Sequence, residues 1–179
     1  MLIQVGTDLH TRIEGVEIAT APTIAEIHAL LGPATRIAEP ATPAPVKHRN
    51  THWHIYDADG LYFNEHHYTR RVESATLVFW PEEHQFLPTP QLPFSGKLLL
   101  AGYEVSQQLD LRTLVQSCPI PFEHRLGGWV GLTLGEFSIN ITVAGVRLPS
   151  GRRSEKDLRL VAISLGWPHD PWGAPAEAT

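Results

Sequence analysis

The feature that most constrains the fold is an internal similarity between the two halves of the 179-residue chain. Around residue 15 the sequence reads IEGVEIATAPTIAEIHALLGP, and around residue 102 it reads LAGYEVSQQLDLRTLVQSCPI. One ungapped shift of 87 residues places Gly15 on Gly102 and, near the far end of each half, Trp80 on Trp167. Because the same shift matches at both ends, a duplicated unit is favoured; the alternative is a coincidence between two β-rich segments.

Each half predicts a β-hairpin followed by a short helix. Dipeptides that end in Gly15 and Gly102 interrupt apolar, β-type runs, which is typical of tight hairpin turns. In the first half, Thr23 precedes an apolar stripe, and Glu26 three residues later completes a capping-box pattern. The helix that begins there is expected to end at Gly32, which is followed by proline.

The second half follows the same order. Asp110 is the expected N-cap of a helix that ends before Pro119. The last runs of the two halves, SATLVFW and DLRLVAISLGW, are almost continuously apolar, as expected of strands that are covered on both faces. The sequence therefore predicts an α+β fold of two tandem pseudo-repeats, mostly antiparallel sheet with one short helix packed on each. The expected boundaries are a first ββα-β repeat at 1–83, a linker at 84–93, a second ββα-β repeat at 94–168 and a C-terminal tail at 169–179.

The charge and composition of the chain argue against several classes of function. The chain has 14 basic and 19 acidic residues, and its net charge of −5 argues against nucleic-acid or anionic-membrane binding. Cys118 is the one cysteine, which excludes an intramolecular disulfide and a CxxC site. No apolar run approaches the roughly 18 residues of a membrane span, and the N-terminus lacks the pattern of a signal peptide. We expect a cytoplasmic protein without a cofactor.

The stretch NTHWHIYDADGLYFNEHHYTRR at residues 50–71 predicts a hairpin around the DADG turn. With a two-residue turn His54 pairs with Glu65, whereas with a four-residue loop Tyr56 pairs with Leu61. Because side chains alternate along a strand, both registers place three histidines and one glutamate on a single face, and a three-residue loop would separate them. This combination resembles a zinc or iron ligand set in residue type. The candidate ligands are His52, His54, Glu65 and His67.

The same residues are also ordinary cross-strand pairs of a half-exposed sheet. A single flat hairpin lacks the enclosing groups that orient the ligands of a catalytic metal. We therefore predict no metal and no catalytic residue. Cys118 is expected to be a small core residue, and His28 a core histidine whose hydrogen bonds are satisfied.

Three segments carry a resemblance to a known group of proteins: residues 23–33, residues 56–63 and residues 93–105. Their order is similar to that of a bacterial family of small uncharacterised cytosolic proteins, many of them encoded beside secreted polymorphic toxins and regarded as immunity proteins. The resemblance implies a mechanism in which a rigid face of the protein covers the active site of a cognate toxin. The family provides no catalytic residues to transfer to this chain.

Aromatic residues interleaved with polar ones on the hairpin are typical of protein interfaces and favour this interpretation. Two other functions stay open: a structural or assembly module that forms homo-oligomers, and, less favoured, a metal-dependent enzyme that uses the histidine-rich hairpin. The expected partner is a cognate toxin or another protein, with no membrane and no nucleic acid involved. The expected partner-binding residues are Trp53, Tyr56, Tyr62, His66 and Tyr68.

Overall fold

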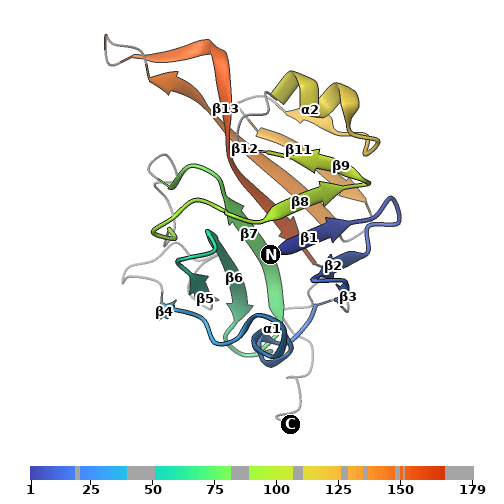
Figure 1. Cartoon of the computed structure of the whole chain (residues 1–179), viewed down its shortest axis with the longest axis vertical. Coiled ribbons are helices and arrows are strands. Elements are labelled where there is room, and N and C mark those ends of the chain that lie inside the picture. The colour runs from blue at the N-terminus through green and yellow to red at the C-terminus, as the bar shows by residue number, and fades with distance from the viewer. Residues whose placement is uncertain are drawn as a thin grey trace.

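The computed structural model of the chain describes residues 1–18, 21–39, 51–81, 89–106, 111–125, 129–134, 137–147, 150 and 152–167. These residues form thirteen strands and two short helices, and the strands make two sheets (Figure 1). The fold is therefore α+β in the broad sense that the sequence predicts. The predicted tail at 169–179, the N-cap Asp110 and the first half of the predicted linker lie outside the described residues.

The smaller sheet brings together the N-terminus and two hairpins from different parts of the chain. Its central strand pairs antiparallel with one hairpin and parallel with the other, as in the pairing of Ile3 with Ile13 and with Leu98. All other strand pairs of the described residues are antiparallel. In spatial order the strands are β3 (Val16–Glu17), β2 (Thr11–Ile13), β1 (Leu2–Val5), β8 (Lys97–Leu100) and β9 (Tyr103–Val105).

The larger sheet joins the two halves at its centre. There β7 (Val72–Val78) and β13 (Arg153–Gly166) pair antiparallel, with Leu77 opposite Ile163, and the remaining strands of each half extend outward from this pair. In spatial order the eight strands are β10 (Glu123–Arg125), β11 (Trp129–Leu134), β12 (Phe137–Arg147), β13 (Arg153–Gly166), β7 (Val72–Val78), β6 (Leu61–His66), β5 (Thr51–Tyr56) and β4 (Arg36–Ala38).

The smaller sheet packs on one face of the larger sheet, and the main hydrophobic core lies between them (Figure 1). Alternate residues of the buried strands point into this core because side chains alternate across a strand. The opposite face of β5, β6 and β7 carries a second, smaller cluster. The main core includes Ile3, Val5, Leu98, Leu100, Phe63, Leu77, Ile139, Ile163 and Leu165; the smaller cluster consists of Trp53, Ile55, Tyr62 and Val78.

Helix α1 (Ile24–Leu31) begins and ends as the sequence predicts. The Thr23 side chain accepts a hydrogen bond from the Glu26 backbone, and the Glu26 carboxylate accepts one from the Thr23 backbone, which completes the capping box. Gly32 follows the last turn with a positive φ of 78°. The second helix, α2 (Leu111–Ser117), ends before Pro119 as expected, and Leu114 is buried in the main core. Within the described residues, neither helix is long and apolar enough to cross a membrane.

The second half of the predicted linker is held against the DADG turn. Asp57, nearly buried, accepts hydrogen bonds from the Arg36 guanidinium at 2.9 Å and from the Gln91 backbone at 2.9 Å. Its carbonyl accepts another from the Leu92 backbone. The hydrogen bonds from Arg36 hold the pKa of Asp57 below its ordinary value despite the burial of the carboxyl group. This network fixes the segment that connects the two halves.

Candidate functional site

The histidine-rich hairpin forms with the four-residue loop, Asp57 to Gly60. Tyr56 is opposite Leu61, so His52 rather than His54 is directly opposite Glu65. The face that carries His52 and Glu65 points toward helix α1 and the main core. The structure therefore brings together the residues that the sequence places on one face of the hairpin.

Glu65 is the centre of this cluster, and it is fully buried. Its Oε2 lies 3.0 Å from Nε2 of His54 and 3.8 Å from Nδ1 of His52. The Arg70 guanidinium approaches the other carboxylate oxygen at 3.1 Å, as an ion pair. Burial raises the pKa of Glu65, but the His54 hydrogen bond and the charges of Arg70 and the histidines outweigh it, and the pKa is below its ordinary value. Glu65 is therefore held as a carboxylate inside the protein.

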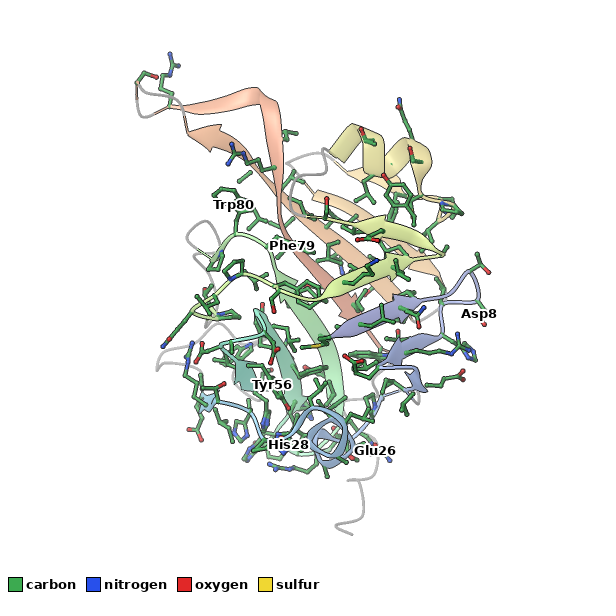
Figure 2. The ribbon with its side chains drawn as sticks, viewed as in Figure 1. Asp8, Glu26, His28, Tyr56, Phe79 and Trp80 are labelled. Atoms are coloured by element: carbon green, nitrogen blue, oxygen red, sulfur yellow. The ribbon has the colours of Figure 1, made fainter. Side chains whose placement is uncertain are left out.

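Helix α1 covers one side of the cluster. The Tyr56 hydroxyl donates a hydrogen bond to the carbonyl of Gly32 at the helix end, and burial raises the pKa of Tyr56 to about 12. Figure 2 labels His28 on this helix and Tyr56 on the sheet behind it. The His28 ring packs edge-on against His54, with 5.5 Å between ring centroids. Nε2 of His28 and Nδ1 of His54 are buried without a hydrogen-bond partner, so the prediction that His28 is satisfied is wrong.

The turn between β6 and β7 closes the other side. Nδ1 of His66 lies within 3.2 Å of the Thr69 hydroxyl, and Arg70 takes a positive φ of 57°. The next residue, Arg71, donates a hydrogen bond to the carbonyl of Ala21, just before helix α1. These contacts hold the helix, the turn and the hairpin together around Glu65.

A contiguous group of more exposed side chains borders the cluster; we call it the histidine strip. Four of its five members are linked in a row: Glu39 Oε1 lies 3.8 Å from Nε2 of His52, the same nitrogen lies 3.2 Å from Nδ1 of His67, and the His67 ring packs edge-on against Tyr68. Tyr68 is 63% exposed, and Ile37 at the other end, on the edge strand β4, is 59% exposed. The histidine strip consists of Ile37, Glu39, His52, His67 and Tyr68.

Of the predicted partner-binding residues, only Tyr68 lies on the surface of the described structure. The other four are less than a tenth exposed, because both faces of the hairpin are covered. Trp53 and Tyr62 belong to the smaller cluster, Tyr56 belongs to the main core, and His66 supports the turn. Ile37 and Glu39, which are also exposed here, are not among the residues that the sequence predicts. A signal was available: an isoleucine and a glutamate stand next to a proline-rich segment, where an edge strand would leave them exposed.

The four candidate metal ligands are neighbours, but they bond to one another. Within the ranges that the structure describes, no group of three or more histidine, cysteine, aspartate or glutamate side chains is placed to hold a metal ion. His54 and Glu65 are almost inaccessible to a substrate. Cys118 is buried, its thiol lies 3.6 Å from the carbonyl oxygen of Leu100, and burial raises its pKa. The cluster is a buried, ion-paired group of side chains that connects the hairpin with helix α1 and with the following turn.

We expect the protein to lose stability when the pH falls from 7.0 to 5.5. Burial lowers the pKa values of His28 and His66 below the ordinary value near 6.5, and neighbouring histidines add to this effect. The unfolded chain then binds protons more readily than the folded chain. The contribution of these two histidines to the free energy of unfolding is therefore fully present above pH 6.5. It decreases as the pH falls through 6.5 toward the pKa values of the folded protein. The pKa of Glu65 is lowered in the folded protein, so Glu65 adds a further loss of stability as the pH falls below its ordinary pKa of 4.5. Burial raises the pKa of Glu73, and this group has the opposite effect on stability.

Thermal unfolding monitored by circular dichroism at pH 7.0, 6.5, 6.0 and 5.5 tests this expectation. The Tm should fall by roughly 2–5 °C over the range. The double variant His28→Gln, His66→Asn should show a flatter profile, because it removes both titrating rings and Asn can still accept a hydrogen bond from Thr69. A Tm of the parent protein that does not change with pH would contradict the assignment.

Comparison with known proteins gives one family. The model of a domain of unknown function, DUF7738, matches residues 7–113, more than half of the chain. The match begins before the hairpin β2–β3 and ends within α2, so it includes the histidine-rich hairpin and the segment at 89–96. Searches of curated proteins and of solved structures found no match.

Proposed function

We propose that this chain, which belongs to the DUF7738 family, is a non-catalytic cytoplasmic protein that binds a protein partner. The partner class that we favour is a bacterial toxin whose active site is covered in the complex. Two lines of reasoning support the proposal: the motif resemblance to immunity proteins, and the histidine strip. The net charge of −5 suits a basic toxin, because opposite charges accelerate association.

The observation that carries the proposal is the exposure of Ile37 and Tyr68 at the two ends of a row of polar side chains. Large apolar and aromatic side chains with a polar surround are the usual composition of protein interfaces. The strip is also held rigidly, since His52 contacts the buried Glu65 at 3.8 Å and Ile37 follows Arg36, whose guanidinium is bound to Asp57. A rigid surface loses little conformational entropy on binding, which favours affinity.

We also propose that the chain arose by duplication. The turns at Glu14-Gly15 and Ala101-Gly102 have closely similar φ values, 51° and 80° in the first and 50° and 82° in the second. In each half the hairpin is followed by one helix and four strands, and the helices begin at Ile24 and Leu111, again 87 residues apart. The pairing of β7 with β13 at the centre of the larger sheet would then relate the two copies.

A growth assay tests the toxin-binding function. The gene product encoded next to this protein is expressed alone and then together with it. We expect the neighbour to arrest growth alone and the pair to grow normally. A harmless neighbour, or a toxic one that this chain neither rescues nor binds, would contradict the proposal.

Variants of the histidine strip then locate the surface. We expect Ile37→Asp and Tyr68→Ala to weaken the complex about 10- to 100-fold each, measured by calorimetry, because truncated anchor residues cost roughly 1–3 kcal/mol. Val16→Asp and Leu92→Ala are matched controls. They change one residue on another short edge strand and one on another loop, and both residues are exposed, at 48% and 55%. Equal effects of the strip and control variants would place the interface elsewhere.

A further inference from the structure

The hairpin of β12 and β13 extends beyond the sheet that holds its base. The adjacent strand β11 pairs with β12 over Trp129–Leu134 and Phe137–Thr142, and β7 pairs with β13 over Ala162–Gly166. Beyond these contacts the two strands pair only with each other within the described residues, from Val143 opposite Leu160 to Arg147 opposite Arg153. We call residues 143–147 and 153–160 the arm. Figure 1 shows it rising away from both sheets.

Two irregularities direct the arm outward. The register of β12 and β13 shifts between Thr142 and Val143, where the arm leaves the sheet, and again between Gly145 and Arg147. Such shifts bend a strand and increase its twist. The base is anchored by the Arg159 guanidinium, which lies 4.8 Å from the centre of the Trp80 ring, and by the buried Leu160.

A two-stranded ribbon of this kind is marginal in water. Independent stability needs three or more strands or a covering layer, because two strands alone bury little apolar area. A protruding ribbon also presents two strand edges that can pair with or dock onto another chain. The arm is therefore stabilised if a second surface covers it.

The charge of the arm is opposite to that of the rest of the protein. Residues 143–160, which comprise the arm and the residues that join its two strands, contain five basic and two acidic residues and have a net charge of +3. The remaining sequence contains nine basic and seventeen acidic residues and has a net charge of −8. The basic residues of the segment are Arg147, Arg152, Arg153, Lys156 and Arg159.

From this asymmetry we infer that the arm docks on a second copy of this chain and contacts its acidic body. A second copy of this chain has a body with a net charge of −8, which is complementary to the positive charge of the arm. A nucleic acid also carries negative charge, but the body at −8 repels it, whereas the body of a second copy attracts the arm. The inference does not depend on toxin binding, because it concerns a different part of the molecule from the histidine strip.

Sedimentation velocity on the full chain at pH 7.5, in 50 mM and in 500 mM NaCl, tests the inference. We expect association at low salt, with a dissociation constant that rises at least about tenfold in 500 mM NaCl, because salt screens exposed charges over roughly 10 Å or less. The double variant Arg147→Glu, Arg153→Glu should be monomeric at low salt. The matched control Arg12→Glu, Lys97→Glu changes the net charge equally outside the arm and should still associate.

Three results would overturn the inference. The first is a parent chain that is monomeric at every concentration in 50 mM NaCl. The second is association that the arm and control variants weaken equally. The third is a parent chain that binds a duplex oligonucleotide at low salt through the arm but does not bind itself. Circular dichroism of each variant excludes loss of folding as the cause of a monomeric state.

Discussion

Replacing Gly60 by alanine is expected to destabilise the protein by about 2–5 kcal/mol. Gly60 ends the DADG turn with a φ of 70°, which costs a residue with a side chain about 1–2 kcal/mol. In addition, a Cβ at this position would overlap the backbone of Pro93 and Phe94, and backbone atoms cannot move aside as a flexible side chain can. Forced overpacking of this kind adds roughly 1–3 kcal/mol. Urea unfolding followed by tryptophan fluorescence measures the loss.

Gly102→Ala is the matched control for this variant. Gly102 has a φ of 82°, but no atom lies within 4 Å of the position of its Cβ. Only the backbone term of about 1–2 kcal/mol should therefore appear. If both variants lose the same stability, the contact between the turn and the segment at 89–94 has no energetic importance. If Gly60→Ala expresses only as insoluble protein while Gly102→Ala folds, the prediction also holds.

The second large effect is expected at Glu65. Glu65→Ala leaves the buried His54 without its carboxylate partner and leaves Arg70 without its counter-charge. Removal of one partner from a buried ion pair costs about 3–5 kcal/mol; because Arg70 is half exposed and regains water, we expect about 3 kcal/mol. Glu65→Gln should lose less, because its amide group retains the size and one hydrogen bond with His54. The free energies of unfolding at pH 7 from urea titrations give the comparison.

A control on the surface separates burial from ion pairing as such. Glu17 also contacts two basic side chains, those of His10 and Arg12, but its own side chain is 49% exposed. Surface ion pairs contribute little, so Glu17→Ala should leave the urea midpoint almost unchanged. A large loss at Glu17 together with a small loss at Glu65 would contradict the view that Glu65 organises the helix, the hairpin and the turn.

The parts of the fold that depend on neighbouring residues were predictable from the sequence. The Thr23–Glu26 capping box begins helix α1, and Gly32 follows its end, because caps act through hydrogen bonds over three or four residues. The turns that end in Gly15 and Gly102 are local in the same way. The four-residue loop was one of two registers that the hairpin sequence allowed, and both place the histidines and Glu65 on one face.

The parts that depend on distant residues were not predictable in the same way. The sequence predicts a half-exposed hairpin, but both of its faces are buried. Tyr56 lies in the main core, which includes residues far away in the sequence, and Trp53 and Tyr62 lie in the smaller cluster. No local pattern distinguishes an aromatic residue that is buried in the core of its own chain from an exposed one that binds another protein. The sequence predicts a linker at 84–93 but gives no sign that Gln91 and Leu92 bind Asp57 across more than thirty residues.

The parallel pairing of β1 with β8 determines how late during synthesis the smaller sheet can form. Residues 2–5 leave the ribosome more than ninety residues before their parallel partner in β8, residues 97–100, is made. Likewise, β7 cannot form its pairing with β13, in which Leu77 is opposite Ile163, until β13 has been made. Non-local pairings of this kind slow folding and leave strand edges open in the nascent chain. The first half is therefore expected to emerge with two unpaired strand edges, at β1 and at β7, which stay open until the second half is made.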